Sequence, residues 1–201
     1  MQPVLGVLGD DRLDPVWDDG SALPGMSVGA LTAHLARAIV RAPEVLADRT
    51  DDPPDAPTAG AYYARAGISA DRASDVNVGV RARSVGDAEP GRVAVLATAT
   101  DAAVACRQIL PALPLDAVVC AFASLRVPVW VYLETRILEI AAHVDDLEAS
   151  VPGLRVTLPE AAWTVATEVG LDAARANVGD RELLRALCRS ERSRSDVFPV
   201  F

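Results

Sequence analysis

WVYLETRILEIAAHVDDLEAS, residues 130–150, carries the strongest helical pattern of the chain. Its apolar side chains recur at steps of three and four residues, the spacing that places them on one face of an amphipathic α-helix. These side chains are Leu133, Ile137, Ile140, Val144 and Leu147. Pro152 and Gly153 follow the segment and are typical of the end of a helix. We therefore predict a helix over residues 130–150.

The same periodicity predicts helices on both sides of this segment. Ser27 is a suitable N-cap for a helix over residues 28–40, where apolar residues again repeat at helical spacing. Further helices are predicted over residues 62–66, 92–113, 159–176 and 179–189.

Other segments have a different pattern. Residues 1–24 are expected to form a loop or a short helix, and residues 48–57, rich in Pro and Asp, an exposed loop. Residues 116–128 form a short β-branched segment, which favours a small hairpin or an extended crossover. Residues 75–86 are polar and mixed and give no clear pattern.

These elements predict an all-α protein built as an antiparallel four-helix bundle. We expect the bundle to occupy residues 1–152, with a short β-hairpin inserted in it. Residues 153–201 are expected to form a small C-terminal helical extension packed on the bundle. The length of 201 residues fits one domain with such an appendage, and the 51% of hydrophobic residues can supply its core.

Charge and composition narrow the classes of function. A formal net charge of −9 disfavours binding to nucleic acid or to anionic membranes, because both depend on a basic surface. No window approaches about eighteen apolar residues without a charge, which argues against a membrane span. The three cysteines, Cys106, Cys120 and Cys188, have no C-x-x-C spacing. We therefore expect no disulfide framework and a reducing cytoplasmic location.

The chain contains only two histidines, His34 and His143, and each falls within a predicted helix. Glu139 precedes His143 by four residues, so a helix places their side chains about 40° apart on one face. Three further polar residues fall beside them: Tyr132, Arg136 and Asp146. A polar line that borders an apolar stripe is typical of a helix face pointing into a cleft.

A carboxylate and an imidazole at this spacing can bind one metal ion. Zn²⁺ accepts nitrogen and oxygen ligands at about 2.0–2.2 Å, and His34, beside the apolar stripe of its own helix, can reach the same ion. Three protein ligands with a fourth position open are typical of a catalytic zinc site. Two plainer interpretations stay open: Glu139 and His143 as a surface i, i+4 pair, and His34 as a partly buried histidine.

Several stretches of the chain also resemble a known family. Residues 27–35, SVGALTAHL, are similar to the first-helix signature of the DinB-like, mycothiol-dependent maleylpyruvate isomerase N-terminal domain. Residues 135–147, TRILEIAAHVDDL, are similar to the segment that carries the later ligands in that family. Trp17 fits the same family, and residues 179–187, GDRELLRAL, with the terminal Phe201, resemble the ending of short stand-alone members.

The resemblance implies a four-helix bundle that holds a divalent metal, usually zinc, through His34, Glu139 and His143. It also implies a low-molecular-weight thiol as cosubstrate, which is mycothiol in high-GC bacteria. The isomerase that names the family has a further C-terminal domain that contributes an arginine to its active site. Only residues 153–201 follow the bundle here, so we do not expect maleylpyruvate isomerisation, although the metal–thiol chemistry can remain.

Three functional hypotheses follow. In the first, a metal-activated thiolate attacks an electrophilic small molecule, which makes the protein a metal-dependent thiol (mycothiol) S-transferase, monomeric or homodimeric. In the second, the metal activates water and the protein is a zinc-dependent hydrolase. In the third, the bundle binds a small molecule or a partner without catalysis.

The polar neighbours have alternative roles under the first hypothesis. Arg136 either holds an anionic part of a substrate or pairs with Glu139 or Asp146. Asp146 either orients an imidazole N–H or is a surface acid, and Tyr132 either donates to a developing anion or packs at the core edge. Arg81 and Arg83 alternate in a stretch expected to be extended; they either face a charged group of the substrate or thiol or lie on the surface.

Overall fold

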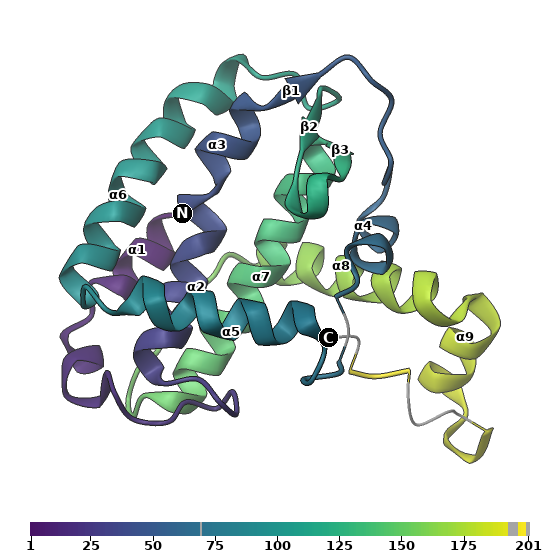
Figure 1. The fold of residues 1–201 in the computed structure, drawn as a ribbon. Coiled ribbons are helices and arrows are strands. Elements are labelled where there is room, and N and C mark those ends of the chain that lie inside the picture. The colour runs from purple at the N-terminus through teal and green to yellow at the C-terminus, as the bar shows by residue number, and fades with distance from the viewer. Residues whose placement is uncertain (69, 193–196, 200–201) are drawn as a thin grey trace.

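The computed structural model describes residues 1–68, 70–192 and 197–199, and it confirms the all-α fold (Figure 1). The bundle consists of α2 (Val28–Val40), α5 (Asp75–Ala88), α6 (Arg92–Ile109) and α7 (Val129–Ser150). Helix α2 lies at its centre, because it packs against α5, α6 and α7.

The remaining helices cover the bundle from two sides. They are α1 (Gln2–Leu8), α3 (Ala42–Ala47), α4 (Ala59–Ala66), α8 (Glu160–Val178) and α9 (Asp180–Cys188). Helices α1 and α3 pack against α6, whereas α8 packs against both α7 and α4 and carries α9 at its end (Figure 1). Short 3-10 turns occur at Asp11–Val16, Leu110–Ala112, Phe122–Ser124 and Ser190–Arg192. Phe201, which contributes to the family resemblance, lies outside the described residues.

The expected hairpin is present and belongs to a three-stranded antiparallel sheet. Strands β2 (Val118–Cys120) and β3 (Arg126–Pro128) form the hairpin, and the two-residue strand β1 (Arg49–Thr50) pairs with β2. Ala123 and Ser124 in the hairpin turn have φ angles of 58° and 57°, in the left-handed region that non-glycine residues rarely adopt. This turn joins α6 to α7 and brings β2 alongside the end of α3.

Side-chain caps start several of these helices. The Ser27 hydroxyl accepts a hydrogen bond from the Ala30 N–H at the start of α2, as the sequence predicts. Ser74 caps α5 and Thr58 caps α4 in the same way. The apolar faces that follow the caps form one core, in which Leu31, Leu35 and Leu147 are fully buried.

Residues 75–88 are helical, which corrects the expectation that Arg81 and Arg83 lie in an extended stretch. The apolar pattern of α5 is weak because only Ser84 and Ala88 are buried, so the helix gives little periodic signal. Its packing against α2 and its Ser74 cap hold it in place instead. In a helix, residues two positions apart point in different directions, so Arg81 and Arg83 do not share one face.

One segment within the described residues, Arg92–Ala112, is long and apolar enough by composition to cross a membrane. A core helix passes the same test, and α6 packs against α1, α2 and α3. Val95, Ala99 and Ala103 of α6 belong to the common core. At its start, Arg92 forms ion pairs with Asp11 and Asp14.

Candidate metal centre and its cavity

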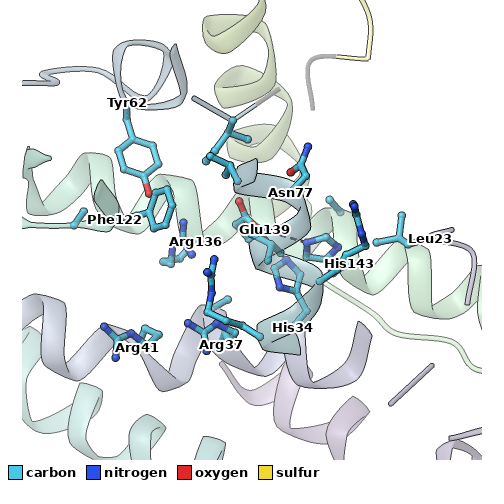
Figure 2. A pocket seen from close by; sticks show the side chains of 18 of the residues that line it. Leu23, His34, Arg37, Arg41, Tyr62, Asn77, Phe122, Arg136, Glu139 and His143 are labelled. Atoms are coloured by element: carbon cyan, nitrogen blue, oxygen red, sulfur yellow. Dashed lines mark ion pairs between the residues drawn. The ribbon is translucent and has the colours of Figure 1, made fainter. Parts of the chain in front are cut away.

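Helices α2 and α7 bring His34, Glu139 and His143 together. Glu139 Oε2 lies 3.9 Å from His34 Nε2 and 3.4 Å from His143 Nε2. The two imidazole rings are 4.5 Å apart, edge to face, and one ligand atom from each residue lies within 4.8 Å of the others. Figure 2 shows both rings and the carboxylate directed at one point.

The other polar atoms of these residues have partners of their own. His143 Nδ1 lies 3.0 Å from Asp146 Oδ2, and His34 Nδ1 lies 3.2 Å from the Ser84 hydroxyl. Tyr63 donates its hydroxyl hydrogen to Glu139 Oε1 at 3.4 Å. Metal-binding histidines typically donate their second N–H to such acceptors, which fix the ring and its tautomer.

The hydrogen-bond partners assign the tautomers of both rings. The carboxylate of Asp146 only accepts, so His143 donates from Nδ1. The Ser84 hydroxyl donates its one hydrogen to the Val80 carbonyl at 2.9 Å, so it accepts from His34 Nδ1. Each neutral ring therefore presents the lone pair of Nε2 to the Glu139 carboxylate. A divalent cation can bind between these three atoms, and a proton on His143 Nε2 that is donated to Glu139 satisfies the same contact.

The residues fit a divalent cation such as Zn²⁺. Atoms bound at about 2.1 Å to a tetrahedral ion lie about 3.4 Å apart, close to the two Nε2–Oε2 distances. Two imidazoles and one carboxylate are also a donor set that catalytic zinc sites use, with the fourth position left to a small ligand.

Burial and charge set the ionisation of the three side chains. Burial, together with the charge of His143, lowers the pKa of His34 to about 4. Burial acts the same way on His143, but hydrogen bonds with Asp146 and Glu139 outweigh it and raise its pKa to about 9. Burial raises the pKa of Glu139, yet the hydrogen bond with His143 and the charge of Arg136 bring it to about 2. At neutral pH and without a metal, the site therefore contains a carboxylate, a neutral His34 and a protonated His143.

The three side chains lie in the wall of a cavity of about 740 Å³. All eight residues that the sequence predicts for the site line this cavity: His34, Arg81, Arg83, Tyr132, Arg136, Glu139, His143 and Asp146. Arg37, Arg41, Tyr62 and Phe122 line it as well, from α2, α4 and the hairpin turn. A cavity of this size is typical of a small-molecule site.

Arg136 lies one turn before Glu139 on α7 and points into the cavity (Figure 2). Its guanidinium stacks over the Tyr132 ring, 5.4 Å from the centroid. Burial lowers the pKa of Arg136, but the charge of Glu139 and the neighbouring tyrosines outweigh this and raise it, so the side chain stays charged. Burial raises the pKa of Tyr132 to about 12 and also raises the pKa of Tyr62, so both phenols remain protonated.

Arg81 and Arg83 line the cavity from α5. The Arg81 guanidinium donates to the Arg72 carbonyl at 2.7 Å, whereas Arg83 is exposed. Neither side chain has a carboxylate within ion-pair distance among the residues described.

Sequence reasoning did not identify Tyr63, Ser84 or Tyr62 as site residues. Tyr62 and Tyr63 are two of only three tyrosines, and their position in a predicted helix was the available signal. Ser84 lies in a segment without clear periodicity and carries no sequence signal. Its role depends on the packing of α5 against α2, which brings the hydroxyl to His34.

Comparison with known proteins gives a family match that covers nearly the whole bundle. The family model described as the mycothiol maleylpyruvate isomerase N-terminal domain matches residues 7–148, which include α2, α7 and all three candidate ligands. A search of curated proteins and a search of solved structures each found no match. Because the family match covers more than half of the chain, the protein belongs to the mycothiol maleylpyruvate isomerase N-terminal domain family.

Proposed function

We propose that this protein is a cytoplasmic, metal-dependent thiol S-transferase that uses mycothiol as cosubstrate. The observation that carries the proposal is the convergence of His34 Nε2, His143 Nε2 and Glu139 Oε2 on one point in a cavity wall. Membership of a family associated with mycothiol supports the choice of thiol.

The donor set suits a divalent cation, with zinc favoured by two imidazoles and one carboxylate. When bound, such a cation lowers the pKa of a coordinated thiol from its usual value of about 8.5 and so supplies a thiolate at neutral pH. Asp146 and Ser84 fix the two imidazoles, and Tyr63 fixes the carboxylate, so the ligand atoms are held in place before the ion binds.

The remaining cavity residues bind and orient the substrates. Arg136 and Tyr132 lie next to the ligands on α7, where they can hold the electrophile beside the thiol sulfur. Arg81 and Arg83 on α5 are assigned to polar groups of the thiol or the electrophile. The thiolate sulfur forms a bond to the electrophilic carbon, and the leaving group departs with the electron pair of the bond that breaks.

The test combines metal analysis with a thiol assay. Purified protein is expected to contain about one divalent ion per chain and to consume mycothiol with small electrophiles such as 1-chloro-2,4-dinitrobenzene, releasing chloride. His143→Ala should lose most of the metal and all transfer while it remains helical by circular dichroism. Glu139→Gln should retain more metal than His143→Ala, because an imidazole is the stronger ligand at this site.

Arg107→Gln, on the exposed face of α6, is the matched control and should behave as the wild type. Full metal occupancy in His143→Ala would refute the ligand assignment. Conversion of the electrophile at the same rate without any thiol, with incorporation of water, would indicate the zinc-dependent hydrolase instead. Metal binding without any conversion would leave a binding protein.

A further inference from the structure

Beside Glu139, the cavity contains four side chains that are not candidate metal ligands. Figure 2 shows Tyr62, Phe122 and Arg136 grouped there, and Tyr132 lies beneath the Arg136 guanidinium. We call these four residues the aromatic end. They come from α4, the hairpin turn and α7.

Arg136 is the cation of the aromatic end, and its charge is not neutralised by an ion pair. Within residues 1–68, 70–192 and 197–199, no carboxylate lies within ion-pair distance of its guanidinium. Its hydrogen bonds are long ones, of 3.4 Å from Nε and Nη2 to the Thr135 hydroxyl. By contrast, Arg37 pairs with Asp87 and Arg41 pairs with Glu44 on the neighbouring wall.

Two buried phenols supply further donors at the same place. Tyr62 is 2% exposed and Tyr132 is 4% exposed, and both line the cavity. Neither hydroxyl has a hydrogen-bond partner in the part of the chain that the structure describes. Both hydroxyls open onto the cavity, so together with the guanidinium of Arg136 they can donate to a ligand that accepts hydrogen bonds.

We propose that the aromatic end binds a carboxylate of the electrophile through Arg136 and the Tyr62 and Tyr132 hydroxyls, and that the substrate is a planar aromatic or unsaturated monocarboxylate. The two oxygens of a carboxylate match the fork of a guanidinium. A phosphate fits less well, because the aromatic end itself supplies one cation for its two negative charges, and the second charge would face Glu139.

The aromatic rings around Arg136 indicate what kind of carbon skeleton the ligand has. Tyr62, Tyr132 and Phe122 are three of the nine aromatic residues of the chain, and all three line this cavity. Phe122 is 43% exposed and stands on the strained turn at Ala123 and Ser124. Aromatic walls favour flat, unsaturated groups, which stack on the rings or contact their edges.

The position of Arg136 also limits the length of the substrate. Glu139 lies three positions after it on α7, a rise of about 4.5 Å along the helix axis. A carboxylate bound at Arg136 therefore places a carbon only a few bonds away beside the sulfur of the bound thiol. This reaction step rests on the proposed function, whereas binding of the carboxylate does not and can be measured without any thiol.

Benzoate and benzamide are suitable probes, because they have nearly the same shape and differ in charge. By calorimetry on the metal-loaded protein, benzoate should bind at least about tenfold more tightly than benzamide, as expected for a charge-assisted bidentate contact. Arg136→Gln should remove this preference by weakening benzoate alone. Tyr62→Phe should weaken benzoate by about three- to tenfold with little change in fold, and Phe122→Ala should weaken both probes equally.

Arg107→Gln serves again as the control and should leave both affinities unchanged. Equal affinity for the two probes, or benzoate binding that survives Arg136→Gln, would overturn the proposal. Benzoate coordinated by the metal would instead be lost in His143→Ala and retained in Arg136→Gln. Arg136-dependent binding in a protein that transfers no thiol would refute the proposed function but leave the carboxylate site standing.

Discussion

Glu139 divides its two oxygens between two tasks. Oε1 accepts the Tyr63 hydrogen bond, and Oε2 faces both imidazoles. Each imidazole also uses its two nitrogens differently. Nε2 faces the carboxylate, whereas Nδ1 is hydrogen-bonded to Asp146 in His143 and to Ser84 in His34. A change at any of these three outer partners is therefore expected to act on the metal through a ligand that it orients.

Asp146→Asn tests this expectation directly. An asparagine side chain keeps the shape but loses the charge that holds His143 Nδ1–H, so we expect zinc affinity to fall by about 10–100-fold. Asp145→Asn is the matched control, since the neighbouring carboxylate is exposed. Competition with a chromophoric chelator measures both affinities, and equal loss in the two variants would show that only net charge matters.

At the scale of elements, the backbones of α4 and α8 approach each other closely at Gly60. The Gly60 N–H donates to the Asp172 carboxylate at 2.6 Å, and a Cβ on Gly60 would lie 2.4 Å from the Asp172 carbonyl oxygen. Only glycine allows this approach, which positions Tyr62 and Tyr63 in the next turn of α4. The packing of α8, in the C-terminal extension, on α4 therefore helps to position two tyrosines of the site.

Gly60→Ala is therefore expected to destabilise the protein by about 1–3 kcal/mol, because the backbones of α4 and α8 must separate. Gly170→Ala in α8 is the control: a Cβ there meets no atom within 4 Å, so the change should stabilise the helix by about 0.5–1 kcal/mol. Urea denaturation measures both effects. A neutral Gly60→Ala would show that the two helices can separate without cost.

The loop before α4 is tied to the hairpin by an ion pair with a predictable pH dependence. Arg126 donates to both Asp55 oxygens, and these hydrogen bonds lower the pKa of Asp55 from 3.8 to about 2. A lowered carboxyl pKa contributes stability above pH 4, which is lost as the pH falls through 2.

The stability difference between wild type and Asp55→Asn should therefore be constant from pH 7 to about 5 and shrink between pH 4 and 2. Denaturation midpoints of both proteins across this range provide the measurement. A difference that does not change with pH would mean that packing, rather than the charge of Asp55, holds the loop.

Some helices and strands could be predicted from the sequence, and others could not. Residues 130–150 form a helix because their buried face repeats without interruption, and α7 begins within one residue of the predicted start. Helix α5 could not be predicted, because it buries only Ser84 and Ala88 and depends on contacts with α2. Strand β1 has two residues and exists only because β2 pairs with it.

For the molecule as a whole, the site joins α2 and α7, which are far apart in the chain. His34 and His143 could be singled out because the chain has no other histidine, and the helical repeat placed Glu139 beside His143. The outer partners Tyr63 and Ser84 could not, because their place depends on how α4 and α5 pack on the bundle. The domain boundary at residue 152 stays a prediction, although α8 shares its core with α7.

A metal that binds only the folded chain must stabilise it. At a free zinc concentration of about one hundred times Kd, the gain is about 2.7 kcal/mol, which for a chain of this size raises Tm by roughly 5–11 °C. Differential scanning calorimetry with zinc and with a chelator measures the shift. His34→Ala should show little rise, and an equal rise in that variant would place the ion elsewhere.

Helix α5 and the β2–β3 turn contribute walls of the cavity but none of the three candidate ligand atoms. Substitutions at Arg81, Arg83 or Phe122 can therefore alter which molecules are accepted while the reactive centre stays intact. Under the proposed function, libraries confined to these three positions would therefore vary substrate selectivity and leave the candidate ligands in place.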